Sequence, residues 1–388
     1  MILENFTLCS PRPSVNLKEA DPKNPIVVRS TIDLAAVAEN HVVIKVDRFG
    51  FSANNVTYQA LGEHPHFRYF DFHPAPTSEL ARTHGLIPVW GFGTVVASTH
   101  SKIHVGERVY GYLAPTRYLV VPVSKSDVNK HAFYVPRPHL PEGSYKTSDD
   151  GKLSILISSA SSKTAFSLAY LVQKRIRAGE LPNVTVVGLT SKRNLGFTQR
   201  LGLYDGVYEY DTFVKAQAFQ GDVNRRWLYV DVAGNADLNE RVKSHFASPT
   251  NVGRIVKNVS LGATNLAPSA SANDDMSWSH NAFNTSSGVV DDPTIRWPIV
   301  EHFFMPEWLN VRKHQLPISE IFRRQAVAWS DLMRDCRTWV QLERVYGAEK
   351  VRDDYIRIAK GGLGPDKGLI WSLWDAEVSS SKPLAARL

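Results

Sequence analysis

Apolar positions in the first third of the chain fall in short runs that are typical of β-strands. Four segments combine β-branched and aromatic residues with alternating or continuous apolar positions: His41–Val46, Pro88–Ser98, Val105–Tyr112 and Arg117–Val123. Strands this short and this closely spaced predict a compact, barrel-like β unit.

After the polar segment Lys146–Lys152, strand and helix patterns alternate along the chain. They follow one another in the order Leu153–Ser158, Thr164–Lys174, Val184–Leu189, Asn194–Leu201, Gly206–Tyr210 and Trp227–Val232. Strand–helix–strand units at these spacings predict a parallel sheet.

The last third begins with Asn265–Pro298, which is rich in Ser, Asn and Asp. A polar loop of this length is usually functional or mobile. Pro317–Arg344 has apolar residues at helical spacing and predicts a long amphipathic helix with a solvated arginine face. Gly368–Leu373 predicts a final strand.

Composition narrows the class of protein. A chain of 388 residues predicts two or three domains, and 43% apolar with 21% charged residues is ordinary for a globular protein. No apolar run reaches the roughly 18 residues of a transmembrane helix, and Met1–Val15 lacks the pattern of a secretory signal. Cys9 and Cys336 are the only cysteines, which excludes a disulfide framework or a cysteine-based zinc site. We expect a cytoplasmic protein.

The net charge of +7 comes from 45 basic and 38 acidic residues that are scattered along the chain. Nucleic-acid binding would need a clustered basic stripe or a recognised module. We therefore expect no nucleic acid and no membrane as partners. A slightly basic enzyme with an anionic cofactor agrees with this charge.

The strand, turn and helix of Ile155–Leu171 hold the first candidate site. A dinucleotide fold carries G-x-G-x-x-G here, so that bare backbone approaches a pyrophosphate at a helix N-terminus. In this chain small residues replace the glycines, and phosphate contacts could come from Ser161, Ser162, Lys163 and Thr164. Two alternatives stay open. One is a P-loop that lacks both of its glycines, and the other is an ordinary turn with a serine N-cap.

The second candidate site is the end of the next strand, Gly188–Asn194, which includes Thr190. In a doubly wound fold this strand end meets the adenosine ribose. An acidic residue there binds the 2′-hydroxyl of NAD, and arginine accommodates the 2′-phosphate of NADP. Here Lys192 and Arg193 are adjacent and no acidic residue is present, which favours NADPH. A surface turn with two solvated cations is the alternative.

A third, weaker pattern is Tyr229–Asn235, a strand that ends in D-x-x-G. Its Gly234 would lie where a cofactor crosses the sheet edge. An ordinary exit from a strand has the same pattern.

The order of these motifs resembles the medium-chain dehydrogenase/reductase superfamily over nearly the whole chain. Val42–Gly62 is similar to the start of that superfamily's catalytic domain. Gly91–Tyr112, the most specific stretch, is similar to its segment ending in V-G-D-R-V, and Leu203–Asp211 resembles its Gly-Ala-Asp turn. The phrases SANNVTYQALG and SSASSKTA look like a poorly characterised fungal and bacterial branch.

This resemblance implies an α/β fold with a GroES-like β-rich catalytic domain and a Rossmann domain with a doubly wound parallel sheet. We expect the N-terminal part of the catalytic domain over residues 1–145. The Rossmann NADP-binding domain would span 146–285, and the return segment that completes the catalytic domain would span 286–388. The site would be the cleft between the domains. A homodimer is common in that superfamily.

The zinc-dependent members of the superfamily have a cysteine and a His-Glu pair at places that fall here on Ser52, Phe92 and Gly93. The four-cysteine zinc lobe is absent too. The resemblance therefore implies an enzyme without a metal, on the quinone-reductase and enoyl-reductase side, that uses NADPH. A histidine cluster has poor metal geometry and better suits the rim of an aromatic pocket or a cap on the β unit: His64, His66, His73 and His84.

The superfamily's polar pocket groups fall on Ser52, Asn55 and Tyr58, and Asn54 could replace either neighbour in another register. Tyr58 could donate a proton or a hydrogen bond to a developing enolate oxygen, and a packed aromatic is the alternative. Thr264 lies where the resemblance places the last strand–helix loop, near the nicotinamide.

We therefore expect an NADPH-dependent oxidoreductase of secondary metabolism. It would transfer a hydride to an activated C=C or C=O of a quinone-, enone- or polyketide-like small molecule. Because a fold does not fix a function, two rivals remain. One is a repurposed scaffold that performs hydrolysis, isomerisation or C–C cleavage without the cofactor. The other is a non-catalytic NADPH-binding sensor.

Overall fold

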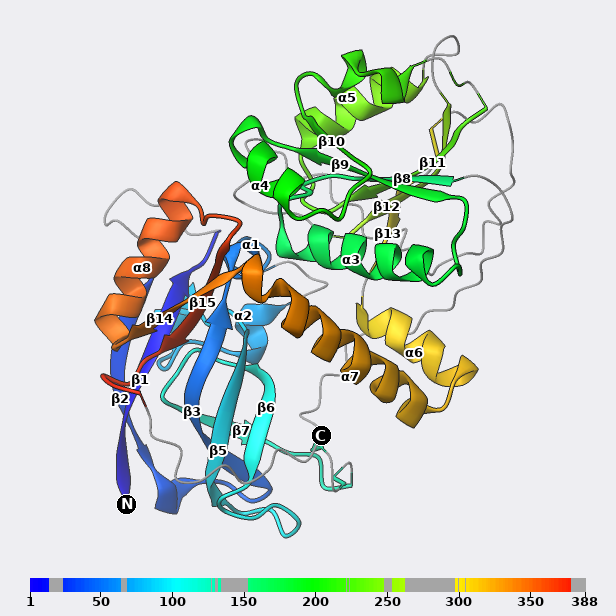
Figure 1. Cartoon of the computed structure of the whole chain (residues 1–388). Helices are drawn as coiled ribbons and strands as arrows, with labels where there is room; N and C mark the ends of the chain where they lie inside the picture. Colours follow the sequence, from blue (N-terminus) through cyan, green and yellow to red (C-terminus); the bar gives the residue numbers. More distant parts are fainter. Residues whose placement is uncertain are drawn as a thin grey trace. The chain divides into compact units, whose positions relative to one another are not determined.

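The computed structural model describes residues 1–13, 24–63, 68–126, 128–129, 132–133, 153–220, 222, 224–247, 253–261, 297–298, 300–303 and 305–377. The chain forms two compact units (Figure 1). The first consists of residues 1–140 and 342–388, and the second of residues 141–341. Thr264, His64 and His66 lie outside the described residues, as does most of Asn265–Pro298.

The first unit is built from antiparallel strands. One sheet has the order β2-β1-β4, from β1 (Ile2–Pro11), β2 (Ile26–Asp33) and β4 (His84–Gly85). The other has the order β14-β15-β3-β5-β6, and β7 also pairs with β3. Its strands are β3 (His41–Phe51), β5 (Val89–Ser98), β6 (Arg108–Leu113), β7 (Tyr118–Pro122), β14 (Gln341–Tyr346) and β15 (Lys367–Ser372). The helices are α1 (Ala53–Ala60), α2 (Tyr69–Phe72) and α8 (Ala348–Gly361).

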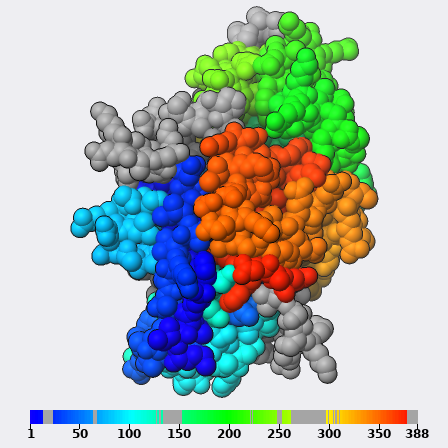
Figure 2. Space-filling view, turned by 90° about the vertical axis from the view of Figure 1, so that its left-hand side faces the viewer, coloured from blue at the N-terminus to red at the C-terminus, as the bar shows by residue number. Residues whose placement is uncertain are grey.

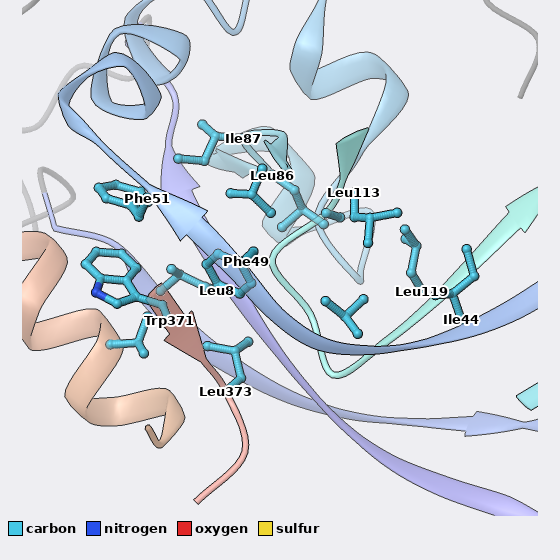
Figure 3. Packing of buried hydrophobic residues seen from close by; sticks show 14 of the residues in the cluster. Leu8, Ile44, Phe49, Phe51, Leu86, Ile87, Leu113, Leu119, Trp371 and Leu373 are labelled. Carbon is cyan, nitrogen blue, oxygen red and sulfur yellow. The ribbon is translucent and has the colours of Figure 1, made fainter. Parts of the chain in front are cut away.

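The C-terminal segment completes the core of this unit. Helix α8 buries one face, because its apolar residues recur at helical spacing, and it lies beside β1 and β2 (Figure 2). The Trp371 ring of β15 stacks on Phe51 of β3 with 4.0 Å between ring centroids (Figure 3). Tyr355 of α8 packs on Phe51 at 4.8 Å. The β unit predicted from the N-terminal strands therefore needs residues from the far end of the chain.

Two glycines let β3 and β5 approach each other closely. A Cβ atom added to Gly93 would lie 2.5 Å from the Ile44 side chain and 2.8 Å from the Lys45 carbonyl oxygen. One added to Gly91 would lie 2.9 Å from the carbonyl oxygen of Arg48. These glycines face inward, so the alternate residues of β5 face away from the core.

The second unit contains a parallel sheet with the order β10-β9-β8-β11-β12-β13 in the described part of the chain. The strands are β8 (Leu153–Ile157), β9 (Val184–Thr190), β10 (Gly206–Glu209), β11 (Arg226–Asp231), β12 (Arg254–Ser260) and β13 (Val300–His302). Counted within this unit, the order is 3-2-1-4-5-6, which is that of the Rossmann fold. The predicted fold class is confirmed.

Helices cover both faces of this sheet, as Figure 1 shows for α3 and α5. The α-helices that the structure describes in this unit are α3 (Lys163–Arg177), α4 (Leu195–Arg200), α5 (Ala236–Ala247), α6 (Met305–Gln315) and α7 (Ile318–Asp335), of which α6 packs on α7. Leu332 of α7 is buried in the core cluster that contains α3, and Tyr170 of α3 donates a hydrogen bond to Asp335 over 2.7 Å.

Helix α7 explains two differences from the sequence-based expectations. The chain returns to the first unit at residue 342 and not at 286, because α7 packs on α3. The helix expected over Pro317–Arg344 ends at Asp335, and Gln341–Tyr346 forms strand β14. The predicted span ran past the end of the helix into the first four residues of this strand.

The close approach of β3 and β5 gives a first prediction. Replacing Gly93 with alanine should lower the free energy of unfolding by about 1–3 kcal/mol, because a methyl group has no room beside the Lys45 backbone. Gly50→Ala in β3 is the matched control, since its Cβ would meet nothing nearer than 3.9 Å. Equilibrium denaturation of both variants makes the comparison. Equal stability of the two would contradict the packing described.

Candidate functional site

The carboxyl ends of the parallel strands form the candidate cofactor site of the second unit. Strands β9 and β10 lie on one side of β8, and β11, β12 and β13 lie on the other. The strand order therefore changes direction between β8 and β11. In open α/β sheets, ligands bind outside the carboxyl ends of the strands at such a switch point.

The turn after β8 lies between the first strand of the sheet and the start of α3, where a dinucleotide fold carries its glycines. Ser159 has a φ of 50°, in the left-handed region that glycine adopts most readily. The Ser162 hydroxyl accepts a hydrogen bond from the Ala165 N–H over 3.2 Å and so caps α3. Gly188 of β9 lets the turn pack closely, because a Cβ there would lie 2.8 Å from that of Ala160. The sequence-predicted N-cap and phosphate-binding roles of this turn are compatible with each other.

The predicted phosphate-binding side chains gather at the N-terminus of α3. Ser161 is buried, Ser162 and Lys163 are partly exposed, and Thr164 is exposed. The Ser161 hydroxyl accepts a hydrogen bond from the Asn194 amide over 3.0 Å, which ties this turn to the end of β9. The first N–H groups of a helix lack partners within it, and the helix dipole is positive there. The arrangement suits an anion.

The end of β9 presents two cations. Lys192 and Arg193 are both exposed, and neither makes an ion pair with any residue that the structure describes. Thr190 is fully buried, and its hydroxyl faces that of Thr198 at 3.5 Å. Thr190 therefore packs inside the end of β9, and the two exposed cations can bind a ligand.

The aspartate of the D-x-x-G pattern, Asp231, is buried and organises the end of β11. Asp231 accepts hydrogen bonds from the Ser158 hydroxyl and the Asn239 amide, at 2.9 and 2.7 Å. It also accepts the Ala233 and Gly234 N–H groups. Burial raises the pKa of Asp231, and the hydrogen bonds from Asn239 and Ser158 oppose that rise. The N–H of Gly234 is bonded to Asp231, which leaves this glycine its carbonyl oxygen and its lack of a side chain for a ligand.

In the first unit, α1 carries the three predicted catalytic residues. Ser52 is the N-cap of α1 and shares a capping box with Asn55. Asn55 is buried and donates its amide to the Pro88 carbonyl over 3.0 Å, so it holds the local structure together. Tyr58 is partly exposed, and its hydroxyl accepts a hydrogen bond from the Asn54 amide over 2.8 Å. Asn54 is thus the asparagine that contacts Tyr58.

Two further tyrosines, which the sequence analysis missed, meet Tyr58. Its ring lies 5.1 Å from that of Tyr69 and 6.1 Å from that of Tyr112. Tyr112 hydrogen-bonds to both tyrosines, and its pKa is raised by burial and by these two neighbours. We call these residues the tyrosine cluster. The only signal in the sequence is the alternation in Arg108–Tyr112, which places Tyr112 on one face of β6.

The positions that align with the zinc ligands of the superfamily hold Ser52, Phe92 and Gly93. Phe92 is exposed on β5, Gly93 has no side chain, and the Ser52 hydroxyl points to Asn55 at 3.3 Å. Among the described residues, no group of three or more His, Cys, Asp or Glu side chains could hold a metal ion. In the same part of the chain, no helix is both long enough and apolar enough to cross a membrane.

The comparison with family models identifies the chain. A model described as a protein of unknown function (DUF2855) matches residues 49–145 and 144–364. The chain belongs to the DUF2855 family. A comparison of the chain with curated proteins gave no match.

Solved structures share the fold of this DUF2855 protein at low sequence identity. CurA from Vibrio vulnificus is 12% identical, the match covers 95% of this chain and 98% of that one, and the TM-score is 0.53. The quinone oxidoreductase from Coxiella burnetii is 13% identical, with 95% and 99% covered and a TM-score of 0.51. An Etr1p mutant in complex with NADP and crotonyl-CoA is 12% identical, with 96% and 100% covered and a TM-score of 0.51. The predicted likeness to medium-chain reductases, with GroES-like and Rossmann parts, is confirmed at the level of the fold.

The Asp231 network gives a second prediction. In Asp231→Asn, an NH₂ group must face donors on one side of the residue, whichever way the amide is turned. We expect the free energy of unfolding to fall by about 2 kcal/mol, the usual cost of a buried polar group that loses its partner. Asp211→Asn, at an exposed aspartate, is the control. If denaturation showed the two variants to be equally stable, Asp231 would not organise this strand end.

Proposed function

We propose that this protein is an NADPH-dependent reductase that transfers a hydride to an activated C=C or C=O of a small organic molecule. The observation that carries the proposal is the pair of exposed cations, Lys192 and Arg193, beside a hydroxyl-lined turn at the switch point of a Rossmann sheet. The fold shared with CurA from Vibrio vulnificus, which has also been crystallised with NADPH, supports it.

The residues of the turn fit a dinucleotide. Ser159 adopts the left-handed backbone that the missing glycine would provide, and Gly188 keeps the turn close to the sheet. The hydroxyls of Ser162 and Thr164 and the ammonium of Lys163 stand at the start of a helix of 15 residues. They would hold the pyrophosphate together with the N–H groups of the first helical turn.

The end of β9 would select NADPH over NADH. A dianionic 2′-phosphate gains charge-assisted hydrogen bonds from a guanidinium and an ammonium, and a ribose hydroxyl gains little from either. No acidic residue stands between Gly188 and Asn194 to accept a 2′-hydroxyl. Gly234 would allow close approach at the end of β11, and Thr264 would line the nicotinamide end of the site.

When bound, the nicotinamide would supply the hydride. The reduction also needs a proton or a hydrogen bond for the oxygen on which negative charge develops. Tyr58 would provide it. The amide of Asn54 donates to the Tyr58 oxygen and would stabilise the charge left there when the proton moves. Ser52 and Asn55 would position α1, through the capping box and the bond to Pro88.

Cofactor titration tests this proposal. We expect NADPH to bind the purified protein more tightly than NADH, as followed by nicotinamide fluorescence. Arg193→Ala should weaken NADPH binding by about 10- to 100-fold, because a charge-assisted hydrogen bond to phosphate is lost, and should leave NADH binding nearly unchanged. Lys192→Ala should act in the same direction.

The control is Arg177→Ala, which removes an exposed arginine at the opposite end of α3, about 20 Å from the turn. It should not alter the affinity for NADPH. Failure of the folded protein to bind either cofactor would overturn the proposal. Equal loss of NADPH and NADH binding in Arg193→Ala would remove the assigned role of that residue.

A further inference from the structure

An exposed row of aromatic side chains crosses one face of the first unit. In Trp90, Phe92 and Tyr110, 52%, 43% and 61% of the residue surface is exposed. Single exposed apolar side chains are ordinary, but a contiguous group commonly marks a binding surface. The row joins the tyrosine cluster, and we define it as Tyr69, Tyr58, Tyr112, Trp90, Tyr110 and Phe92.

The strand register places these rings together. Gly91 and Gly93 face β3 closely, so Trp90 and Phe92 must face the other way. Trp90 lies opposite Tyr112 of β6, and Phe92 lies opposite Tyr110. Side chains directly opposite each other on antiparallel strands have their Cβ atoms about 5 Å apart, which brings large rings into contact.

The rings form an unbroken series of contacts. Trp90 and Tyr110 are stacked, with centroids 5.6 Å apart and planes 24° apart. Tyr110 contacts Phe92 at 4.7 Å, and Trp90 contacts Tyr112 at 5.1 Å. From Tyr112 the series continues into the tyrosine cluster. The row therefore offers stacked rings in its middle and phenol hydroxyls at one end.

Strand β3 has no side chain beside Trp90, because the residue there is Gly50. Gly50 of β3 is exposed, and a Cβ placed on it would be 3.9 Å from the nearest atoms, which include the Trp90 carbonyl oxygen. Arg48, two residues earlier, lies over the Phe92 ring at 5.9 Å. Half of its side chain is exposed, and Glu377 lies 3.9 Å away. A cation thus stands at the end of the row opposite to the tyrosine cluster.

We propose that the aromatic row binds a planar, polycyclic aromatic molecule, which stacks on Trp90 and Tyr110 and directs an oxygen substituent to the tyrosine cluster. This inference rests on the proposed function and names the substrate class of the same reductase. Flat fused rings gain from stacking against aromatic faces, and a linear acyl chain gains far less. The phenol hydroxyls of the tyrosine cluster would bind the oxygen substituent of the ligand. Arg48 suits an anionic or electron-rich edge at the other end of the ligand.

Binding of a fluorescent probe tests the proposal without cofactor or turnover. The probe is anthracene-9-carboxylate, which has three fused rings, and its fluorescence anisotropy is followed on the full chain. Benzoate and decanoate serve as one-ring and linear competitors. We expect the probe to bind and both competitors to displace it at least about tenfold more weakly than unlabelled phenanthrene-9-carboxylate does.

Three variants locate the binding surface. Trp90→Ala and Tyr110→Ala should each weaken probe binding about tenfold, because each removes a stacking face. Gly50→Leu should block the probe, because its side chain would fill the open space beside Trp90. The space around the Cβ of residue 50 allows this variant to fold. The matched control is Trp329→Ala on α7, where 62% of the residue surface is exposed. It should bind the probe like the unaltered protein.

The inference is overturned if decanoate competes as well as phenanthrene-9-carboxylate. It is also overturned if circular dichroism shows Trp90→Ala and Gly50→Leu to be folded and they bind the probe normally. Either result combined with normal NADPH binding leaves the proposed reductase intact with a different substrate class. Probe binding as predicted, with no binding of NADPH, would keep the aromatic site and overturn the reductase.

Discussion

The hydrogen bond between Ser158 and Asp231 joins the ends of β8 and β11, the two strands between which the strand order of the parallel sheet reverses. The same Ser158 hydroxyl accepts the Val232 N–H, so the two strand ends are bonded to each other in both directions. Buried polar groups are stable only when their partners are present, and Asp231 has four donors. The turn after β8 can then have serines where related folds have glycines, because the bonds of Ser158 to Asp231 and Val232 fix the position of the turn.

A second constraint acts in the first unit, where Gly91 and Gly93 bring β3 and β5 together. The inner face of β5 has no room for side chains at these two positions, and the bulky residues therefore lie on the outer face. One packing requirement thus accounts both for the core around Ile44 and for the exposed rings of Trp90 and Phe92. The tyrosine cluster extends this face through Tyr112.

Much of the fold follows from local patterns in the sequence. Alternation of strand and helix patterns from Leu153 onward predicted the parallel sheet, and the turn between Ser158 and Thr164 was located correctly at the start of α3. Long-range pairing was not predictable in the same way. The pairing of β15 with β3 joins residues more than 300 positions apart, and the sequence alone placed the return of the chain at 286 and not at 342.

The candidate site shows the same division between local and long-range information. The hydrogen bond from Asn54 to Tyr58 spans one helical turn, whereas the sequence offered Asn54 only as a replacement for a neighbour in another register. Tyr69 and Tyr112 reach Tyr58 only through the packing of α2 and β6, which a pattern in one segment does not encode. Asn55 was expected in the pocket, but its amide is bonded to Pro88, which lies 33 residues away. Thr264 lies outside the described residues, so its role stays a prediction.

We propose that a serine-lined turn and two cations take the place of the usual glycine-rich dinucleotide site. A crystal structure of the protein with NADPH tests it most directly. We expect the 2′-phosphate to lie against Lys192 and Arg193, and the pyrophosphate to lie at the N-terminus of α3. A dinucleotide bound elsewhere, or with its 2′-phosphate turned away from both cations, would contradict it.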